Sequence, residues 1–577
     1  MSSQTGTPGA AGATFLILAQ LFTKLFTFVS NQLLVGSISP EVMGVVAVME
    51  FYVSFVLFFS RESERLTIQR ATGSSKGTVQ QKIVNFAYIP LLISVPLCIA
   101  GYLAVKDTAV LNTSFLLEYR PLAIGLVVVS ILLELAVEPL YALTQYELNF
   151  KVRSSIESTA VFAKCLLTFV GVTLGKYYSV QNPSGMAVLS FLSGQLGYAL
   201  VTVVGYLRHF HFRVPKSGKV RDKENKYFLD PALKKLYYTL FFQMLFKLFL
   251  TEGDKIMMGY LFDVSQQGTY AVITNYGSII ARLVFLPVEE MLRNSFTRVF
   301  SAEKPDTKAA YATMGNLLAF YVYFSILLVL GGYFNGSFLL GTLLGRSAAW
   351  RNSDLFSLFP KYILYLPFMA FNGILEAFQS SILKQSQISK YSYFMLFSTI
   401  VSSIVSVVLV NEWNYGLTGL IIANITSMTL RIAYCSRSYL VFAKEKGVNL
   451  SDVNVLTRTF WPIAYSIFAY ILQVQVIGPR SSTFKDFLIS GAICFSCLLV
   501  FLFNEKNAIK DQIVTTMRRS RGFQDKKTTN IDNSRVTNTK NKNIKKRMES
   551  QLPYFTIGTK AIERAVRFAS TTGSLSC

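Results

Sequence analysis

Long apolar runs alternate with short polar segments along most of the chain. A helix needs roughly 20 apolar residues to cross the hydrocarbon of a bilayer. Within the runs, apolar and polar residues do not alternate as they would in the strands of a membrane barrel. The pattern therefore predicts an all-α, multi-pass membrane protein with about fourteen transmembrane helices, at 13–35, 41–60, 83–105, 121–145, 154–174, 184–207, 237–260, 267–288, 311–334, 357–380, 391–411, 415–438, 457–478 and 484–504.

Two of these helices are less regular than the others. The helix predicted at 237–260 contains four charged residues, and the one at 357–380 begins beside Pro360. The first apolar run is too long for a signal peptide and lacks a basic segment ahead of it, so we expect a retained helix. Cys494 and Cys497 form a C-x-x-C pattern inside a predicted helix, where we expect ordinary buried thiols.

A short motif suggests that the chain contains a repeat. The pattern Gln-x-x-x-Lys-Leu-Phe occurs at Gln20–Phe26 and again at Gln243–Phe249. Each copy precedes a glycine, Gly44 or Gly268, which we expect in a short turn before the next apolar segment. Two copies of six helices would form a parallel repeat about an axis along the membrane normal, enclosing a central polar cavity. Chance similarity among apolar segments is the alternative.

The repeat predicts five regions. These are an N-terminal six-helix lobe at 1–207, a basic cytosolic linker at 208–236, a C-terminal six-helix lobe at 237–440, two additional transmembrane helices at 441–504, and a basic, disordered cytosolic tail at 505–577.

Charge distribution predicts the orientation of the chain. The sequence is 52% hydrophobic and only 15% charged, against about 25% charged in soluble domains, yet its net charge is +24. Loops on one side of the predicted topology carry several times more lysine and arginine than those on the other, which places that side in the cytosol. An even helix number places both termini there. Asn112 and Asn335 begin sequons on the opposite, luminal side and are glycosylation candidates.

Charged residues inside predicted helices are candidates for function, because each costs about 2.5–3.5 kcal/mol at the bilayer centre. They must pair or face water. They are Lys24, Glu50, Glu134, Glu138, Lys164, Lys247, Glu252, Asp254, Lys255, Arg282, Glu376 and Arg431. Candidates for binding an anionic ligand are Lys24, Arg61, Lys247, Arg282 and Arg293. Acidic cavity or ion-pair candidates are Glu134, Glu138, Glu252, Asp254, Glu289 and Glu290.

The alternative is that these residues only stabilise the fold. Lys247 and Asp254 are spaced to pair across two helical turns, and residues near the interface can extend toward water. Glu134 and Glu138 lie on one helical face, where they would carry protons if unpaired or else pair with a neighbouring lysine.

Several chemistries lack their motifs. The sequence contains no phosphate-binding G-x-x-x-x-G-K-[ST] loop, no zinc-spaced Cys/His set, and two histidines, both in the linker. We therefore expect no enzyme activity, no catalytic residue, no metal and no cofactor. The basic linker has no nucleic-acid motif beside it, so anionic lipid headgroups are its expected partner, not nucleic acid.

Several stretches resemble the RFT family, eukaryotic proteins linked to translocation of dolichol-linked oligosaccharide in the endoplasmic reticulum. They include Leu250–Ile256, Gln267–Ala271, Asn275–Ser278, Pro287–Glu290 and Asn372–Phe378, and the resemblance runs from about 13 to 510. The family is similar in fold to bacterial lipid II flippases and MATE exporters, which implies two six-helix lobes plus two further helices.

The resemblance also implies a function. The expected activity is a flippase that moves pentamannosyl-chitobiosyl-diphosphodolichol from the cytosolic to the luminal leaflet of the endoplasmic reticulum for protein N-glycosylation. Its diphosphate would dock on one or more of Lys24, Arg61, Lys247, Arg282 and Arg293. Expected partners are this dolichyl-diphosphate oligosaccharide, membrane lipids and, as a further option, other N-glycosylation proteins. One alternative is a non-transporting accessory factor of the same pathway, and another is an ion-coupled small-molecule exporter.

Overall fold

The computed structural model describes most of the chain between residues 27 and 506. The described residues are 27, 30, 32–71, 75–147, 149–178, 181–222, 225–300, 306–345, 347–383, 385–448 and 455–506. Those up to Phe501 belong to one compact unit, Leu18–Phe501. Most of the helix predicted at 13–35, with Lys24, lies outside the described residues, and so does the predicted tail after residue 506.

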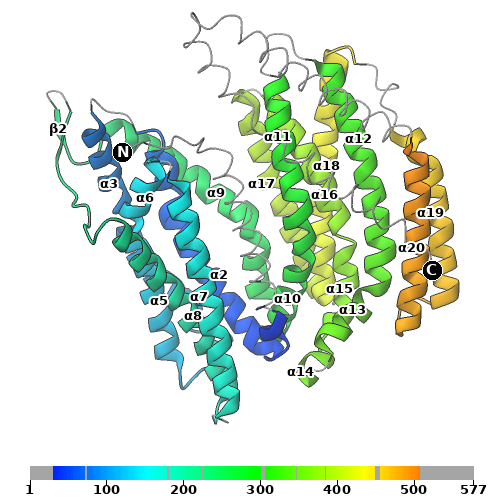
Figure 1. Ribbon diagram of the computed structural model, residues 1–577, viewed down its shortest axis with the longest axis horizontal. Coiled ribbons are helices and arrows are strands. Elements are labelled where there is room, and N and C mark those ends of the chain that lie inside the picture. The colour runs from blue at the N-terminus through cyan, green and yellow to red at the C-terminus, as the bar shows by residue number, and fades with distance from the viewer. Residues whose placement is uncertain are drawn as a thin grey trace, which may run out of the picture. The chain divides into compact units, whose positions relative to one another are not determined.

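The described chain is almost entirely helical (Figure 1). The helices are α2 (Pro40–Ile68), α3 (Lys76–Ala87), α4 (Ile89–Val105), α5 (Arg120–Ala136), α6 (Glu138–Tyr146), α7 (Phe150–Tyr177), α8 (Pro183–His209), α9 (Pro231–Leu261), α10 (Val264–Ile280), α11 (Leu286–Phe300), α12 (Thr307–Leu327), α13 (Phe334–Leu344), α14 (Ala348–Arg351), α15 (Leu355–Ile363), α16 (Leu366–Ile382), α17 (Gln385–Val407), α18 (Gly416–Glu445), α19 (Val455–Ile477) and α20 (Phe484–Asn504).

Each helix predicted from 41–60 onward has a helical counterpart, which confirms the all-α fold class. Among the described residues, 12 helical segments are long and apolar enough to cross a membrane. The charged helix α9 is not among them, so the number fourteen is not confirmed.

Several predicted helices are interrupted. The segment at 83–105 divides at Tyr88 and the one at 121–145 divides at Val137, each two residues before a proline. Proline has no N–H to donate and is accepted in the first turn of a helix, so each proline fits the start of the second helical segment. Three π-helical turns occur later, η1 (Ala281–Phe285), η2 (Leu328–Tyr333) and η3 (Val408–Glu412). Such turns add one residue to a helix and are frequent at functional sites.

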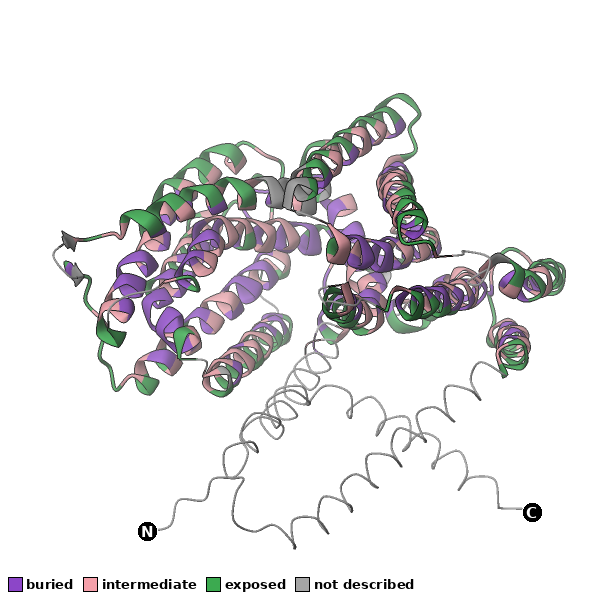
Figure 2. Cartoon of the chain, turned by 90° about the horizontal axis from the view of Figure 1, so that it is seen from above, coloured by how far each residue is buried: buried purple, intermediate pink, exposed green. Residues whose placement is uncertain are grey.

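The helices pack as two groups. In the N-terminal bundle (α2–α8), α8 packs against α5 and α7, and α2 packs against α4, α5 and α8. In the C-terminal bundle (α10–α18), α16 packs against α11 and α18. The last helices, α19 and α20, lie beside α12, where Phe501 stacks on Tyr323 with 4.8 Å between ring centroids. Figure 2 shows buried residues on the faces that neighbouring helices turn toward each other.

The two bundles meet where α2 crosses α10. Both helices begin with a side-chain cap, Ser39 for α2 and Asp263 for α10. Gly44 and Gly268 therefore lie inside helices, and the expectation that they form turns was wrong. A Cβ on Gly44 would lie 1.9 Å from the Val264 carbonyl oxygen, and one on Gly268 would lie 1.8 Å from the Pro40 carbonyl oxygen. Glycine is needed because the two backbones touch.

The linker between the bundles is docked on α3. It contains a short antiparallel hairpin, β1 (Val220–Asp222) and β2 (Asn225–Tyr227). The Asn85 amide donates to the carbonyls of Gly218 and Phe228 and accepts from the Gly218 N–H. Buried Lys82 pairs with Asp230 at 2.8 Å. Burial raises the pKa of Asp230, but hydrogen bonds from Lys82 and the Ala232 N–H outweigh it, and the net shift is downward.

Candidate functional site

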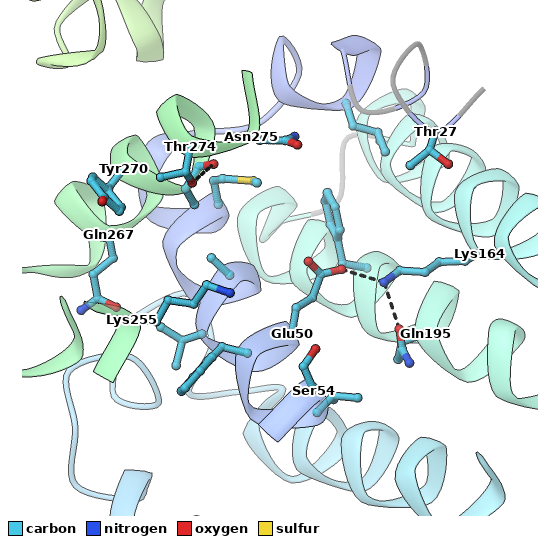
Figure 3. Close-up of a pocket in the computed structure, with 18 of the residues that line it drawn as sticks. Thr27, Glu50, Ser54, Lys164, Gln195, Lys255, Gln267, Tyr270, Thr274 and Asn275 are labelled. Carbon is cyan, nitrogen blue, oxygen red and sulfur yellow. Dashed lines mark hydrogen bonds and ion pairs between the residues drawn. The ribbon is translucent and has the colours of Figure 1, made fainter. Parts of the chain in front are cut away.

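A cavity of about 820 Å³ lies where the two bundles meet (Figure 3). This volume is toward the upper end of the range for ligand pockets, roughly 300–1,000 Å³. Helices α2, α7 and α8 supply lining residues from the N-terminal bundle, and α10, α15, α16 and α18 supply them from the C-terminal bundle. Lys255 and Met258 of α9 also line it. The cavity is the place where both groups of helices can contact one ligand.

Helix α2 directs a row of polar side chains into the cavity. Glu50, Ser54 and Arg61 follow one another at spacings of four and seven residues, which places them on one face of a helix with 3.6 residues per turn. The same rule places Lys164 and Thr168 on one face of α7. The helical period therefore brings charge from two helices to one wall.

A continuous polar network crosses this wall. Lys164 Nζ lies 2.7 Å from Glu50 Oε1 and 2.9 Å from the side-chain oxygen of Gln195. Gln195 donates to Glu134 Oε1 at 2.9 Å, and Arg61 bonds Glu134 Oε2 at 3.2 Å. Glu134 is only 4% exposed, whereas Lys164 and Arg61 are 28% and 24% exposed. Both cations can thus reach a ligand while carboxylates balance them.

The wall built by the C-terminal bundle carries no charged residue among the described ones that line the cavity. Helix α10 contributes Gln267, Tyr270 and Thr274 from one face. The hydroxyl of Tyr270 accepts a hydrogen bond from Asn424 at 3.1 Å, and its ring packs edge-on against Tyr362. Figure 3 shows the α10 residues on one side of α2 and Lys164 with Gln195 on the other. This wall offers hydrogen bonds and ring faces.

Helix α9 adds one further cation. Lys255 lines the cavity, lies 2.6 Å from Glu252 of its own helix, and stands 5.8 Å from the ring centre of Phe51. Its side chain is 56% exposed, so solvent screens this pair.

The predicted anion-binding residues divide into three groups. Arg61 lines the cavity. The side chains of Lys24 and Lys247 lie outside the described part of the structure. Arg282 and Arg293 are exposed on η1 and α11 and are not among the residues that line the cavity, so the expectation that they contact a ligand there is not supported. Arg282 instead holds the cavity residue Asn275, through its carbonyl and its side-chain oxygen.

The predicted acidic residues also separate. Glu134 belongs to the cavity network, whereas Glu138 is bound by both sides of the Arg65 guanidinium, at 2.9 Å for the Nη2 contact. Each carboxylate thus pairs with an arginine from α2. Glu252 pairs with Lys255 and Glu290 is exposed.

The remaining two acidic candidates are Asp254 and Glu289. The Asp254 side chain is not described. Glu289 is half-buried against Gly373, where a Cβ would lie 1.7 Å from its Oε1. Within the described chain, no group of three or more His, Cys, Asp or Glu side chains is placed to hold a metal ion.

The two predicted glycosylation sites differ in exposure. Asn112 is exposed, and its side chain bonds the Lys106 and Thr108 carbonyls and Arg120. Asn335 is 4% exposed inside α13 and donates to Ser490 and the Gly331 carbonyl. A buried amide with these partners is a packing residue, which corrects the expectation for Asn335.

The sequence had marked Lys164, Glu50 and Lys255 only as charged residues within helices, without assigning them to a ligand. Lys164 lies 114 positions from its partner Glu50, so their pairing has no local signal. Gln195 and the tyrosines of the C-terminal wall carried no charge and were missed. The helical spacing on α2 and α10 was the available signal.

The fold and the cavity together define a class: a multi-pass helical membrane protein with a polar cavity between two bundles. Within that class the chain belongs to the Rft protein family, whose sequence profile matches residues 9–515.

Relatives of the same name occur in several organisms. The Man(5)GlcNAc(2)-PP-dolichol translocation protein RFT1 of Candida albicans is 36% identical over 516 residues, covering 85% of this chain and 92% of the relative. The protein of that name from Saccharomyces cerevisiae is 34% identical over 553 residues, covering 84% and 95%. Among solved structures, the lipid II flippase MurJ in an inward closed conformation aligns with a TM-score of 0.56 at 14% identity. That alignment covers 86% of this chain and all of MurJ, and it shows a shared fold.

Proposed function

We propose that this protein moves the glycolipid named for its relatives, Man(5)GlcNAc(2)-PP-dolichol, from the cytosolic to the luminal leaflet of the endoplasmic reticulum for protein N-glycosylation. The observation that carries the proposal is the cavity, which joins an ionic wall with two partly exposed cations to an uncharged aromatic wall. The ligand has the matching composition, a diphosphate joined to neutral sugars. No covalent bond changes, so the protein is not an enzyme.

The ionic wall suits the diphosphate. Arginine binds phosphate oxygens with two parallel hydrogen bonds, and lysine acts as a point charge. In the described conformation Lys164 and Arg61 already hold carboxylates. A diphosphate would bind the donors of Lys164 and Arg61 that still face the cavity, while Glu134, only 4% exposed, keeps its hydrogen bonds to Arg61 and Gln195. Arginine and lysine each carry several donors, so each can hold a carboxylate and a phosphate oxygen at once.

The uncharged wall suits the sugars. Sugar hydroxyls need hydrogen-bond partners once they leave water, because an unpaired buried hydroxyl costs roughly 1–3 kcal/mol. Asn275 and Asn424 supply amide groups, and Gln267, Tyr270 and Tyr362 line the cavity with a small part of their side chains, each 5% exposed or less. The polyprenyl chain needs no such partner and stays in lipid.

Movement between leaflets requires the cavity to open alternately to each side. We propose that the regions 1–207 and 237–440 are two lobes that rock against each other, with the α2–α10 crossing at Gly44 and Gly268 as the fixed point. The linker 208–236, the helix pair 441–504 and the tail 505–577 complete the chain. Both termini lie in the cytosol in this arrangement, and Asn112 faces the lumen as a glycosylation site.

An accessory protein that binds the glycolipid without moving it is the second candidate. It is favoured by the pairing of Lys164 and Arg61 with carboxylates, which also suits a static binding site. Other proteins of N-glycosylation would then be its partners. An ion-coupled exporter of small molecules fits less well, since the cavity joins two chemically different walls.

A leaflet assay separates these candidates. Purified protein is reconstituted in sealed vesicles with Man(5)GlcNAc(2)-PP-dolichol, and transfer between leaflets is followed for the native chain and Lys164→Ala. Lys176→Ala serves as the matched control, because it removes an exposed lysine of the same helix, α7, that is not among the residues lining the cavity. We expect transfer that Lys164→Ala reduces and Lys176→Ala preserves. Binding without transfer above protein-free vesicles would overturn the flippase and support the accessory protein.

A further inference from the structure

A buried carboxyl group without a partner lies close to the cavity network. Glu64 follows Arg61 by three residues on α2, and its side chain is fully buried. Neither carboxylate oxygen has a hydrogen-bond partner in the described structure. The hydroxyls of Ser60, one turn earlier on α2, and of Tyr237, on α9, are likewise buried without a partner. Tyr237 is close enough to interact electrostatically with Glu64.

The cations near Glu64 are already committed to other carboxylates. Arg61 bonds Glu134, and Arg65 bonds Glu138 with both sides of its guanidinium while its plane lies 3.8 Å from the ring centre of Tyr141. Each of these arginines therefore pairs with one carboxylate, and Glu64 has no arginine partner.

Among the described residues, the other helices packed against α2 bring no unpaired buried cation to Glu64. On α9, Lys234 and Lys235 are exposed, Lys255 pairs with Glu252, and the Lys247 side chain lies outside the described residues. On α3, buried Lys82 pairs with Asp230. Helices α4 and α10 contain no charged residue, α5 faces α2 with Glu134, and α8 brings the hydroxyl of Tyr198. A carboxylate in this position would be a buried charge with no hydrogen bond or ion pair of its own, which is a costly arrangement in a protein.

We propose that Glu64 is a proton-binding site, occupied by a proton in the conformation described here. A protonated carboxyl is neutral and can donate one hydrogen bond, so small side-chain rotations bring Ser60 and Tyr237 within reach as its partners. The ligand is a proton because the carboxyl oxygens and two hydroxyls are too few to replace the water shell of a metal cation.

The C-terminal bundle places a second carboxyl, Glu289, at the equivalent position, half-buried where Glu64 is fully buried. Glu64 stands twenty residues after Gly44, and Glu289 stands twenty-one after Gly268. The π-turn η1 lies between Gly268 and Glu289 and accounts for the additional residue.

This second carboxyl also lies beside an acid that an arginine has already paired. Arg431 binds Glu376 at 2.9 Å, and Glu289 itself forms no hydrogen bond or ion pair with a described residue. Arg293, its neighbour on α11, is exposed. Two bundles that each place an unpaired carboxyl next to an Arg–Glu pair point to a shared requirement for the position, and not to an accident of packing at Glu64.

Loss of the proton would change the preferred arrangement of the helices. A proton released as pH rises leaves a bare charge between α2, α6 and α9, and the charge is relieved only when these helices move to admit water or a cation. Low pH therefore favours the described conformation and high pH favours another. Any effect on glycolipid transfer rests on the proposed function, whereas the protonation itself does not.

Infrared spectroscopy tests the protonation directly. The full-length protein is reconstituted in lipid vesicles and its spectrum at pH 7 is compared with that of Glu64→Gln, which keeps the shape and removes the acid. In the native protein we expect a carbonyl absorption of protonated carboxylic acid, shifted in D₂O, with one component that Glu64→Gln lacks and any contribution of Glu289 remaining in both spectra. Glu62→Gln, on the same helix, is the control and should retain that component.

Three results would overturn the proposal. In the first, native protein and Glu64→Gln have the same protonated-acid absorption, so that Glu64 is ionised. In the second, sodium replacing choline removes the absorption, which would make the ligand a metal cation. In the third, used if Glu64→Gln does not fold, Glu64→Asp leaves the absorption at its native frequency although the carboxyl has moved. None of these infrared experiments measures glycolipid transfer. A result that overturns the proton site is therefore distinct from a result that overturns the proposed function.

Discussion

The two walls of the cavity share a backbone plan but differ in chemistry. Helices α2 and α10 cross at equivalent glycines, Gly44 and Gly268, and turn corresponding faces to the cavity. Six residues after its glycine, α2 carries Glu50, whereas α10 carries Thr274. The network of Glu50, Lys164 and Arg61 makes the N-terminal wall ionic, and the C-terminal wall is made of amides, hydroxyls and tyrosine rings.

The difference shows how a repeat can bind a ligand with two unlike ends. A symmetric cavity would offer charge to both ends and would hold neutral sugars against unpaired ions. Here the crossing at Gly44 and Gly268 keeps the packing of the two bundles alike. The different residues that α2 and α10 carry one or two turns later make one wall suitable for the diphosphate and the other for the sugars. The following experiments challenge this division, beginning with the largest expected effect.

The largest loss of glycolipid transfer is expected when Lys164, the lysine at the centre of the ionic wall, is removed. Lys164→Ala deletes a cation and leaves Glu50 and Gln195 without their shared donor. A hydrogen bond to a charged group contributes about 1.5–3 kcal/mol, so we expect glycolipid transfer in vesicles to fall roughly 10- to 100-fold. Lys164→Arg keeps the charge and should recover most of it. Equal rates for native protein and Lys164→Ala would remove Lys164 from the site.

The α2–α10 crossing should lose stability when a single methyl group is added to its glycine in either bundle. In Gly44→Ala or Gly268→Ala, the added Cβ would meet the backbone of the opposite helix, which cannot yield as a side chain can. We expect a loss of stability of about 1–3 kcal/mol, measured by thermal unfolding in detergent. The control is Gly259→Ala on α9, where a Cβ meets nothing within 4 Å. If all three variants melt alike, the two helices do not depend on glycine contact.

The aromatic wall should contribute less than the ionic wall. Tyr362→Ala removes a ring that packs against Tyr270 and lines the cavity. Aromatic contacts are worth about 0.5–1.5 kcal/mol beyond the area they bury, so we expect glycolipid binding to weaken about 3- to 10-fold. The dependence of binding on salt should stay native, since no charge is lost. A changed salt dependence would mean that the walls are not separate in function.

The smallest effect is expected at Lys255. Its exposed pair with Glu252 is worth about 0–1 kcal/mol, so Lys255→Gln should reduce glycolipid binding by less than about 5-fold. Titration of glycolipid into purified protein measures this. A loss as large as that of Lys164→Ala would extend the ionic wall to α9.

The sequence predicted the parts of this molecule that depend on local pattern. Apolar runs located the helices, because a single apolar run that spans lipid can pair its own backbone polar groups by forming a helix. Prolines two residues past Tyr88 and Val137 were visible, yet the positions of the breaks depend on packing as well. Gly44 and Gly268 were recognised as equivalent but assigned to turns, since a single sequence does not reveal a backbone from the other bundle.

The site was less predictable for the same reason. Arg61 was identified because it lies at a predicted cytosolic helix end, where a phosphate would first arrive. Arg293 has the same local character and Arg282 lies within a predicted helix, and only the fold shows that both lie outside the cavity lining. The partner of Lys164 is more than a hundred residues away, so its role depends on long-range packing.

The most direct test of the two-wall account is to vary the ligand and the protein together. Binding of Man(5)GlcNAc(2)-PP-dolichol and of sugar-free dolichyl diphosphate is measured for the native protein, Lys164→Ala and Tyr362→Ala. The account predicts that Lys164→Ala weakens both ligands by the same factor, whereas Tyr362→Ala weakens only the glycolipid. If Tyr362→Ala weakens both equally, or if the effect of Lys164→Ala disappears when the sugars are absent, the division of the cavity into a diphosphate wall and a sugar wall is contradicted.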